Sequence, residues 1–297
     1  MMCAMGLFDL AMLLILSAIW GSSFIFMRYL SPILGPIATA GMRLFVAGIA
    51  LVLFFLAVRF KPEWKRNWKV FLVTGIINSG IPFLCYSFAA LYLPAAIEAI
   101  LNAMSPMFSA LFGAIWLGER FTWKKGIGLF LGIGGVVLLG RSGEFESSFM
   151  TVLSILACIF AAACYAVAGV YLKKRASDVK PLALAGGSLF FVGVLFLPLI
   201  AAVPPPQPVT LQVALIMVIF GLLCSAVAYI IYFPLLSRVG PTNALTVTFL
   251  IPVFGMLWGA VILGEAVTVP MIAGAAVILS GTFMVVSPRK RKITESA

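Results

Sequence analysis

Charged residues are scarce in this sequence. Only 10% of its 297 residues are Asp, Glu, Lys or Arg, whereas 63% are hydrophobic. Soluble domains carry about 25% charged residues, so this chain cannot cover an ordinary water-facing surface. We therefore predict an integral membrane protein whose apolar surface is in contact with membrane lipid.

Histidine is absent altogether, which excludes a histidine base and a histidine metal ligand. No two acidic residues have helical spacing within an apolar run, so an acid/base pair is not predicted. The five cysteines lack CxxC spacing, and we expect neither a metal site nor a disulfide framework. These features favour a protein that is not an enzyme and has no cofactor. A lipid-modifying membrane enzyme stays as an alternative from another class.

Long apolar runs take the place of charge. A membrane-spanning helix needs about 20 apolar residues, and ten runs qualify, separated by short segments with Pro, Gly or charge. They cover residues 7–30, 36–58, 69–91, 95–117, 123–140, 149–172, 182–202, 211–237, 242–263 and 269–287. The predicted fold is therefore all-α, with ten transmembrane helices.

The net charge of +11 comes from short loops between these runs. With the N-terminus in the cytoplasm, 17 of the 20 basic residues fall on the cytoplasmic side, as the positive-inside rule requires. We expect both termini to be cytoplasmic. Since no basic amphipathic domain is present, nucleic acid is not an expected partner.

The two halves of the sequence are similar to each other. A shift of 146 residues superimposes Gly75 on Gly221, Pro106 on Pro252, and Leu117-Gly118-Glu119 on Leu263-Gly264-Glu265, among other pairs. Because each half has five helices, an odd number, the second repeat is inverted relative to the first. We assign residues 1–145 and 146–297 to the two repeats of one functional unit. Inverted repeats recur in transporters, with the substrate site between the halves.

Amphipathic side chains fall near the middle of several predicted spans, where a polar group needs a partner or a wet cavity. A mostly apolar cavity with few hydrogen-bonding groups suits a small amphipathic solute. The candidate cavity residues of this kind are Trp20, Ser23, Asn78, Ser79, Tyr86, Asn102, Tyr165, Tyr229, Tyr232 and Asn243.

Two charged residues within the spans, Arg43 and Glu98, are also candidates for the cavity. Arg43 lies about 10 Å below the outer boundary, and Glu98 enters its span from the same side. Two interpretations stay open: a structural or snorkelling pair, or contact with the carboxylate or ammonium group of a zwitterionic substrate.

Four residues at repeated positions are expected to be structural. Pro106 and Pro252 interrupt the helical hydrogen bonds of the fourth and ninth spans, and predict symmetric kinks or hinges. Glu119 and Glu265 end the two Leu-Gly-Glu turns, where we expect them to tie loop to helix.

Trp20-Gly21-Ser22-Ser23-Phe24 in the first span, with the paired Pro…Leu-Gly-Glu stretches 106–119 and 252–265, resembles the drug/metabolite transporter superfamily. The chain looks like its EamA-type ten-helix exporters, and most like the YddG-type exporters of aromatic amino acids. The resemblance implies a bacterial inner-membrane exporter of amino acids or related small metabolites. It also implies alternating access around a central cavity.

A multidrug or quaternary-amine exporter of the same superfamily is the alternative, with Glu98 as the candidate carboxylate near the pathway. The related small multidrug transporters couple protons through a mid-membrane Glu on their first helix, whereas this chain has only Asp9 at the cytoplasmic end. Because the duplication already supplies a two-fold partner, we expect a functional monomer.

Overall fold

The computed structural model describes residues 6–140, 148–244 and 246–286, in which every regular element is a helix. The predicted boundary between the repeats, at 145/146, lies outside these residues. The helices are α1 (Leu7–Leu34), α2 (Pro36–Ala57), α3 (Trp64–Gly75), η1 (Ile76–Gly80), α4 (Ile81–Ala89), α5 (Ala95–Asn102), α6 (Ser105–Leu117), α7 (Trp123–Leu139), α8 (Phe149–Arg175), α9 (Pro181–Ala202), α10 (Leu211–Gly221), η2 (Leu222–Val227), α11 (Ala228–Ala244), α12 (Thr246–Leu263) and α13 (Val269–Val286).

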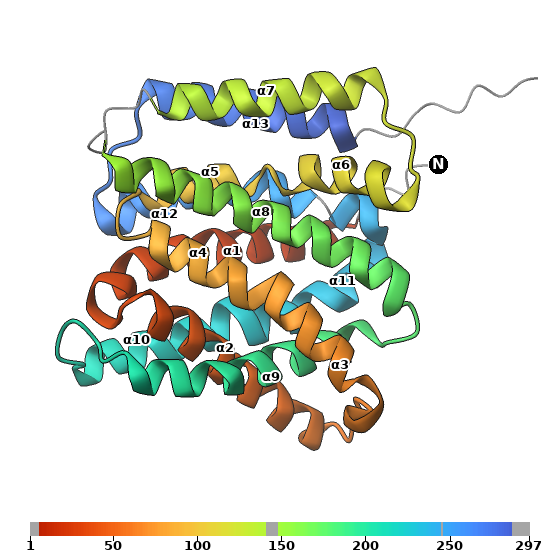
Figure 1. Cartoon of the computed structure of the whole chain (residues 1–297), viewed down its shortest axis with the longest axis vertical. Helices are drawn as coiled ribbons and strands as arrows, with labels where there is room; N and C mark the ends of the chain where they lie inside the picture. Colours follow the sequence, from red (N-terminus) through yellow and green to blue (C-terminus); the bar gives the residue numbers. More distant parts are fainter. Residues whose placement is uncertain (1–5, 141–147, 245, 287–297) are drawn as a thin grey trace, which may run out of the picture.

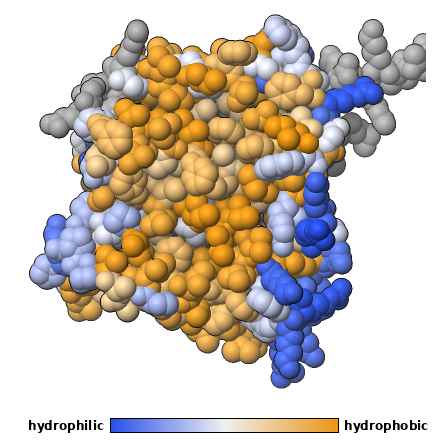
Figure 2. All heavy atoms as spheres, in the orientation of Figure 1, coloured by the Kyte–Doolittle hydropathy of each residue, from blue (hydrophilic) through white to orange (hydrophobic). Residues whose placement is uncertain are grey.

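Nine helices or continuous helix runs in the described chain are long and apolar enough to cross a membrane. The remaining predicted span is α7, whose 17 residues are at the lower limit of about 17–25 residues for a transmembrane helix. The predicted all-α, multi-span membrane fold is confirmed. Figure 2 shows the matching surface, a largely hydrophobic face with its most hydrophilic atoms gathered along one edge.

We call that edge the basic end, because the basic segments 59–69, 120–125 and 173–180 lie there, in loops and in the helix ends next to them. The opposite end, which the positive-inside rule predicts to face outward, is called the outer end. It contains the end of α1, the start of α5 and the end of α12 (Figure 1).

Helix packing follows the internal repeat. The 146-residue shift converts the contact of α1 with α12 into the contact of α8 with α5 and α6. It likewise converts α4 against α8 into α11 against α1, and α3 against α9 into α10 against α2. Two further pairs, α2 with α9 and α7 with α13, join equivalent helices (Figure 1). The fold is thus two related units whose helices are interleaved.

The α7–α13 pair depends on glycine. A Cβ atom added at Gly281 would lie 2.5 Å from the Gly128 carbonyl oxygen, and one at Gly128 would lie 2.6 Å from the Gly281 carbonyl oxygen. Gly135 and Gly274 contact each other's carbonyl oxygens in the same way. Small residues allow this close backbone approach, which is how many transmembrane helices associate.

The third and eighth spans each contain a π-helical segment at its midpoint. η1 and η2 begin at Ile76 and Leu222, which are repeat mates, and each follows a glycine. Pro82 lacks the N–H that would bond the Asn78 carbonyl, which helps to account for η1, although η2 has no corresponding proline. π-Helical turns in α-helices are frequent at functional sites, and both segments border the cavity described below.

The repeated prolines have different local structures. Between α5 and α6 the helix tightens at Ala103 and Met104, whose N–H groups donate to the carbonyls three residues earlier. The hydroxyl of Ser105 donates at 2.7 Å to the Asn102 carbonyl, to which Pro106 cannot donate because it has no N–H. Pro252 lies inside α12 without such a tightening. The symmetric kinks expected from the sequence are therefore not the same structure in the two halves. The hinge role stays a prediction.

The glycine contact predicts a position-specific loss of stability. Gly281→Ala should lower the melting temperature of the detergent-purified protein, since overpacking typically costs about 1–3 kcal/mol. Gly134→Ala, on the same helix pair, is the matched control because no atom lies within 4 Å of its added Cβ. Equal melting temperatures for the two variants would contradict the close α7–α13 approach.

Candidate substrate cavity

A cavity of about 590 Å³ lies between the two halves. Its walls come from both repeats, and it extends to the loop of Ala176, Ser177 and Val179 that joins α8 to α9 at the basic end. Its volume is in the usual range for small-molecule sites, about 300–1,000 Å³. The predicted residues that line it are Trp20, Ser23, Arg43, Asn78, Tyr86, Asn102, Tyr165, Tyr229 and Tyr232.

Three predicted residues do not line the cavity. The Asn243 amide instead donates to the Val239 carbonyl at 3.0 Å. Ser79 is buried in η1, and its hydroxyl has no hydrogen-bond partner in the described chain. Glu98 is fully buried in α5, towards the outer end.

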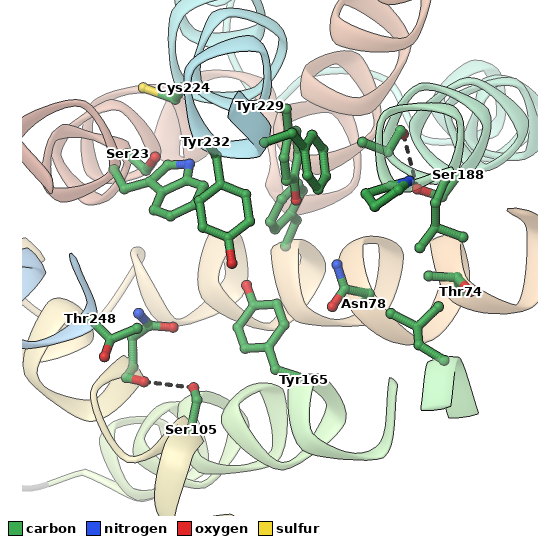
Figure 3. A pocket seen from close by; sticks show the side chains of 18 of the residues that line it. Ser23, Thr74, Asn78, Ser105, Tyr165, Ser188, Cys224, Tyr229, Tyr232 and Thr248 are labelled. Atoms are coloured by element: carbon green, nitrogen blue, oxygen red, sulfur yellow. Dashed lines mark hydrogen bonds between the residues drawn. The ribbon is translucent and has the colours of Figure 1, made fainter. Parts of the chain in front are cut away.

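Aromatic rings form much of the cavity wall. The Trp20 ring centroid is 5.3 Å from that of Tyr232 and 6.2 Å from that of Tyr229. On the facing wall, Tyr86 and Tyr165 stack at 6.5 Å. Figure 3 shows the hydroxyls of Tyr165 and Tyr232 pointing toward one another across the space. The cavity therefore has apolar faces edged by a few hydroxyl groups, as expected for an amphipathic solute.

One wall carries a hydrogen bond from the Tyr86 hydroxyl to the Asn102 side-chain oxygen, at 3.1 Å. Asn102 is the last residue of α5. The tight turn at Ala103 and Met104, which keep helical angles and donate to the carbonyls three residues earlier, thus follows a polar side chain that lines the cavity.

Arg43 is the charged residue of the cavity lining, and it is only 4% exposed. Its Nε donates to the Ser225 hydroxyl at 3.0 Å, and its Nη2 donates to the Ser23 hydroxyl at 3.3 Å and to the Cys224 carbonyl at 3.2 Å. The guanidinium carbon also lies 3.8 Å from the ring centroid of Phe83. No carboxylate of the described chain forms an ion pair with it, so the Arg43–Glu98 pair left open by the sequence is not formed.

Several lining residues were missed by sequence reasoning, although the repeat contained a signal for some of them. Cys224 is the repeat mate of Asn78, and Ser188 is the mate of Arg43 at the 145-residue shift that fits the first helices. Thr248, a mid-span hydroxyl and the mate of Asn102, also lines the cavity. Extending each candidate to its mate would have found Cys224 and Ser188.

The two Leu-Gly-Glu turns form ion pairs that are exchanged between the halves. Glu119 of the first half pairs with Lys173 of the second at 2.9 Å, and Glu265 of the second pairs with Arg28 of the first at 3.6 Å. In each turn the preceding glycine has a φ of +68°, which favours glycine. The hydrogen bond from Lys173 holds the pKa of Glu119 below its ordinary value.

The outer end is closed around Glu265. Its carboxylate also accepts from the backbone N–H of Ala95 at 3.0 Å, at the start of α5. Arg28 in turn donates to the Ala90 carbonyl at 2.7 Å. None of these residues is among those that line the cavity, so the cavity reaches the loop at the basic end, whereas these contacts join helix ends at the outer end.

A family comparison agrees with the internal repeat. The model of the EamA-like transporter family matches twice, over residues 7–141 and 152–287. The chain belongs to the EamA-like transporter family. This places it in the drug/metabolite transporter superfamily and makes it a transporter embedded in a membrane.

Two similar proteins and one solved structure have nearly the same length as this chain. The uncharacterized transporter YvbV of Bacillus subtilis is 26% identical over 84% of this chain and 82% of its own. A probable terminal-alkyne amino-acid exporter of Streptantibioticus cattleyicolor is 23% identical over 90% of this chain and 89% of its own. A crystal structure, 21% identical, covers 92% of this chain and 95% of its own with a TM-score of 0.65, which shows the shared fold.

The exchanged ion pairs predict unequal effects of the same substitution. Glu265→Gln should lower the melting temperature more than Glu119→Gln. The Glu265 side chain is 15% exposed and the Glu119 side chain 41%. Glu265 also accepts a hydrogen bond from the Ala95 N–H. Exposed ion pairs contribute about 0–1 kcal/mol. The contribution of Glu119 is complete above its ordinary pKa, and is lost as the pH falls through its lowered pKa. Thermal unfolding of the two variants at neutral pH measures the difference, and a larger loss for Glu119→Gln would contradict this ranking.

Proposed function

We propose that this EamA-like transporter exports small amphipathic carboxylates, in particular amino acids with neutral or aromatic side chains, by alternating access. The observation that carries the proposal is Arg43, a buried cation in the cavity wall without an acidic partner in the described chain. An ionisable group inside a membrane protein marks a functional site by default.

The hydrogen bonds of Arg43 leave room for a ligand. Nε and Nη2 are engaged by Ser225, Ser23 and the Cys224 carbonyl, while Nη1 has no hydrogen-bond partner in the described chain. A guanidinium group binds a carboxylate through short, charge-assisted hydrogen bonds. A substrate carboxylate would therefore supply both the missing acceptor and the missing negative charge.

The aromatic rings support the other part of the substrate. Trp20, Tyr229 and Tyr232 lie on one wall, and Tyr86 and Tyr165 on the other. Such walls bury an apolar or aromatic side chain. This agrees with the substrate class of the YddG-type exporters. The printed name of the Streptantibioticus cattleyicolor relative, an amino-acid exporter, supports the same class.

The quaternary-amine alternative is less well supported. Its candidate carboxylate, Glu98, does not line the cavity, whereas the positive charge of Arg43 does. A cation entering this space would meet like charge in a low-dielectric environment, which is unfavourable. An enzyme has less support still, because the relatives are named as transporters.

The side to which the cavity opens is the side from which an exported substrate would load. The basic end is cytoplasmic by the positive-inside rule, so substrate would load from the cytoplasm, with both termini on that side. Bacterial relatives make the inner membrane the proposed location. A functional monomer is proposed because the glycines of α7 and α13 face each other within one chain.

Arg43 predicts recognition of the carboxylate. In proteoliposomes, the protein should exchange radiolabelled phenylalanine saturably, and should transport phenethylamine, which lacks the carboxylate, much more slowly. Arg43→Gln should reduce phenylalanine exchange at least about tenfold, since a hydrogen bond to a charged group contributes about 1.5–3 kcal/mol. The same variant should reduce the difference in transport rate between phenylalanine and phenethylamine.

Two controls separate recognition from folding. Lys124→Gln removes a positive charge from the exposed start of α7 and should leave exchange unchanged. Ser225→Ala removes one hydrogen-bond partner of Arg43 and tests whether the position of the Arg43 guanidinium affects phenylalanine exchange. Equal transport of phenylalanine and phenethylamine by the unmodified protein would contradict a carboxylate-binding role for Arg43. No saturable exchange of any amino acid would contradict the proposed substrate class.

A further inference from the structure

Glu98 is a buried acid that the proposed transport site does not use. Its side chain is fully buried in the first half of α5, and neither carboxyl oxygen has a hydrogen-bond partner in the described chain. The charged groups that act on it are Arg28 and Glu265, the ion pair that closes the outer end. A carboxyl group is thus enclosed next to a closing contact without taking part in it.

The surroundings of Glu98 provide no counter-charge that is free. α5 packs against α1, α8, α12 and α13. From α1 comes Arg28, which is engaged by Glu265 and the Ala90 carbonyl. α8 contributes the thiol of Cys158, and α4 contributes the hydroxyl of Tyr86. That hydroxyl already donates its hydrogen bond to the Asn102 side-chain oxygen. α12 and α13 have no titratable residue, and Glu265, just after α12, has the same sign of charge as an ionised Glu98.

Because Glu98 is enclosed, its charge state depends on whether the outer end is closed or open. An ionised carboxylate without a partner in a sealed apolar interior is strongly disfavoured. The neutral acid is therefore the form that suits the structure as described. If the outer end opens, solvent reaches α5 and Arg28 is released from Glu265, and both changes stabilise the ionised form.

The cavity does not give Glu98 a route to the basic end. Asn102 lies one helical turn further along α5, on the same face as Glu98. Its hydrogen bond to Tyr86 forms part of the cavity wall, and Glu98 is not among the lining residues. The Tyr86–Asn102 contact thus belongs to the cavity wall, and Glu98 lies one turn beyond it on α5, outside the lining.

We propose that Glu98 is a proton-binding site that exchanges its proton with the outer side alone, and that a bound proton favours closure of the outer end. The inference rests on the alternating access of the proposed function. In this mechanism the proton bound by Glu98 does not cross the membrane with each transport cycle. Acidity on the outer side instead sets how often the outer end opens.

The test is the accessibility of the outer end as a function of pH on each side. Ser31, one turn after Arg28 on α1, is fully buried, so a thiol in Ser31→Cys reports opening there. The full chain in proteoliposomes is labelled with a membrane-impermeant maleimide. Each rate is divided by that of the same thiol in the unfolded chain at the same pH, and labelling of the native cysteines is subtracted using the protein without Ser31→Cys.

The normalised rate should rise severalfold as the outer pH increases from 6 to 8, up to the tenfold per pH unit that one linked proton allows. Changing the inner pH alone should have no effect. Glu98→Gln, which is always neutral, should keep the rate at its low value. Glu98→Asp should retain the response, and Glu119→Gln at the other end should behave like the parent.

A normalised rate that ignores outer pH, or that follows inner pH, would overturn the proposal. The comparison of outer with inner pH needs no change at position 98, so it stands even if the variants fail to fold. Phenylalanine flux is measured in the same vesicles. Flux without a pH response contradicts the role of Glu98 alone, whereas a pH response without flux contradicts the proposed substrate class alone.

Discussion

Inside a bilayer, each polar group must find its partner within the protein, because no water is available in the hydrocarbon region. This constraint orders most of the features of the bundle. The carbonyl freed by Pro106 accepts from Ser105, and the Ala103 carbonyl beside it accepts from the hydroxyl of Thr282 on α13 at 2.9 Å. Several buried hydroxyls, such as that of Ser79, also lack a partner in the described chain. Arg43 and Glu98 differ from them in being ionisable, and an ionisable group inside a membrane marks a site that can bind something else.

These two residues differ in what surrounds them. Arg43 lies at an open cavity with donors still available, which suits a solute that arrives from the basic end. Glu98 lies behind a wall, enclosed by apolar helices and next to an ion pair. The Arg43 site is therefore suited to a small molecule, and the Glu98 site to a proton. The repeat does not duplicate either residue, since their mates are Ser188 and Ala244, so both break the symmetry that the backbone keeps.

The fold was readable from the sequence because membrane spans and repeats are long, redundant signals. Ten apolar runs located the helices, and the 146-residue shift anticipated the symmetric packing. The cavity was predicted in part: mid-span polar and aromatic residues such as Trp20 and Tyr165 were found by depth alone. Depth does not give the direction in which a side chain points. Ser79 has the right depth but does not line the cavity, and Asn243 lies near the end of its predicted span, just after the break at Gly240. The preceding glycines and Pro82 are only partial signals for the η1 and η2 segments, since η2 has no corresponding proline.

The interleaving of the two halves has a consequence for how the protein is made. α1 enters the membrane first, yet the helix that packs along it, α12, is among the last to be synthesised. Gly21 of α1 lies against Phe254 and Gly255, and the Ala18 carbonyl accepts from the Trp258 indole at 3.0 Å. Until α12 is synthesised, Gly21 and the Ala18 carbonyl of α1 face lipid or the insertion machinery. The nascent chain therefore cannot mature one half at a time, and assembly is completed only when the C-terminal helices arrive.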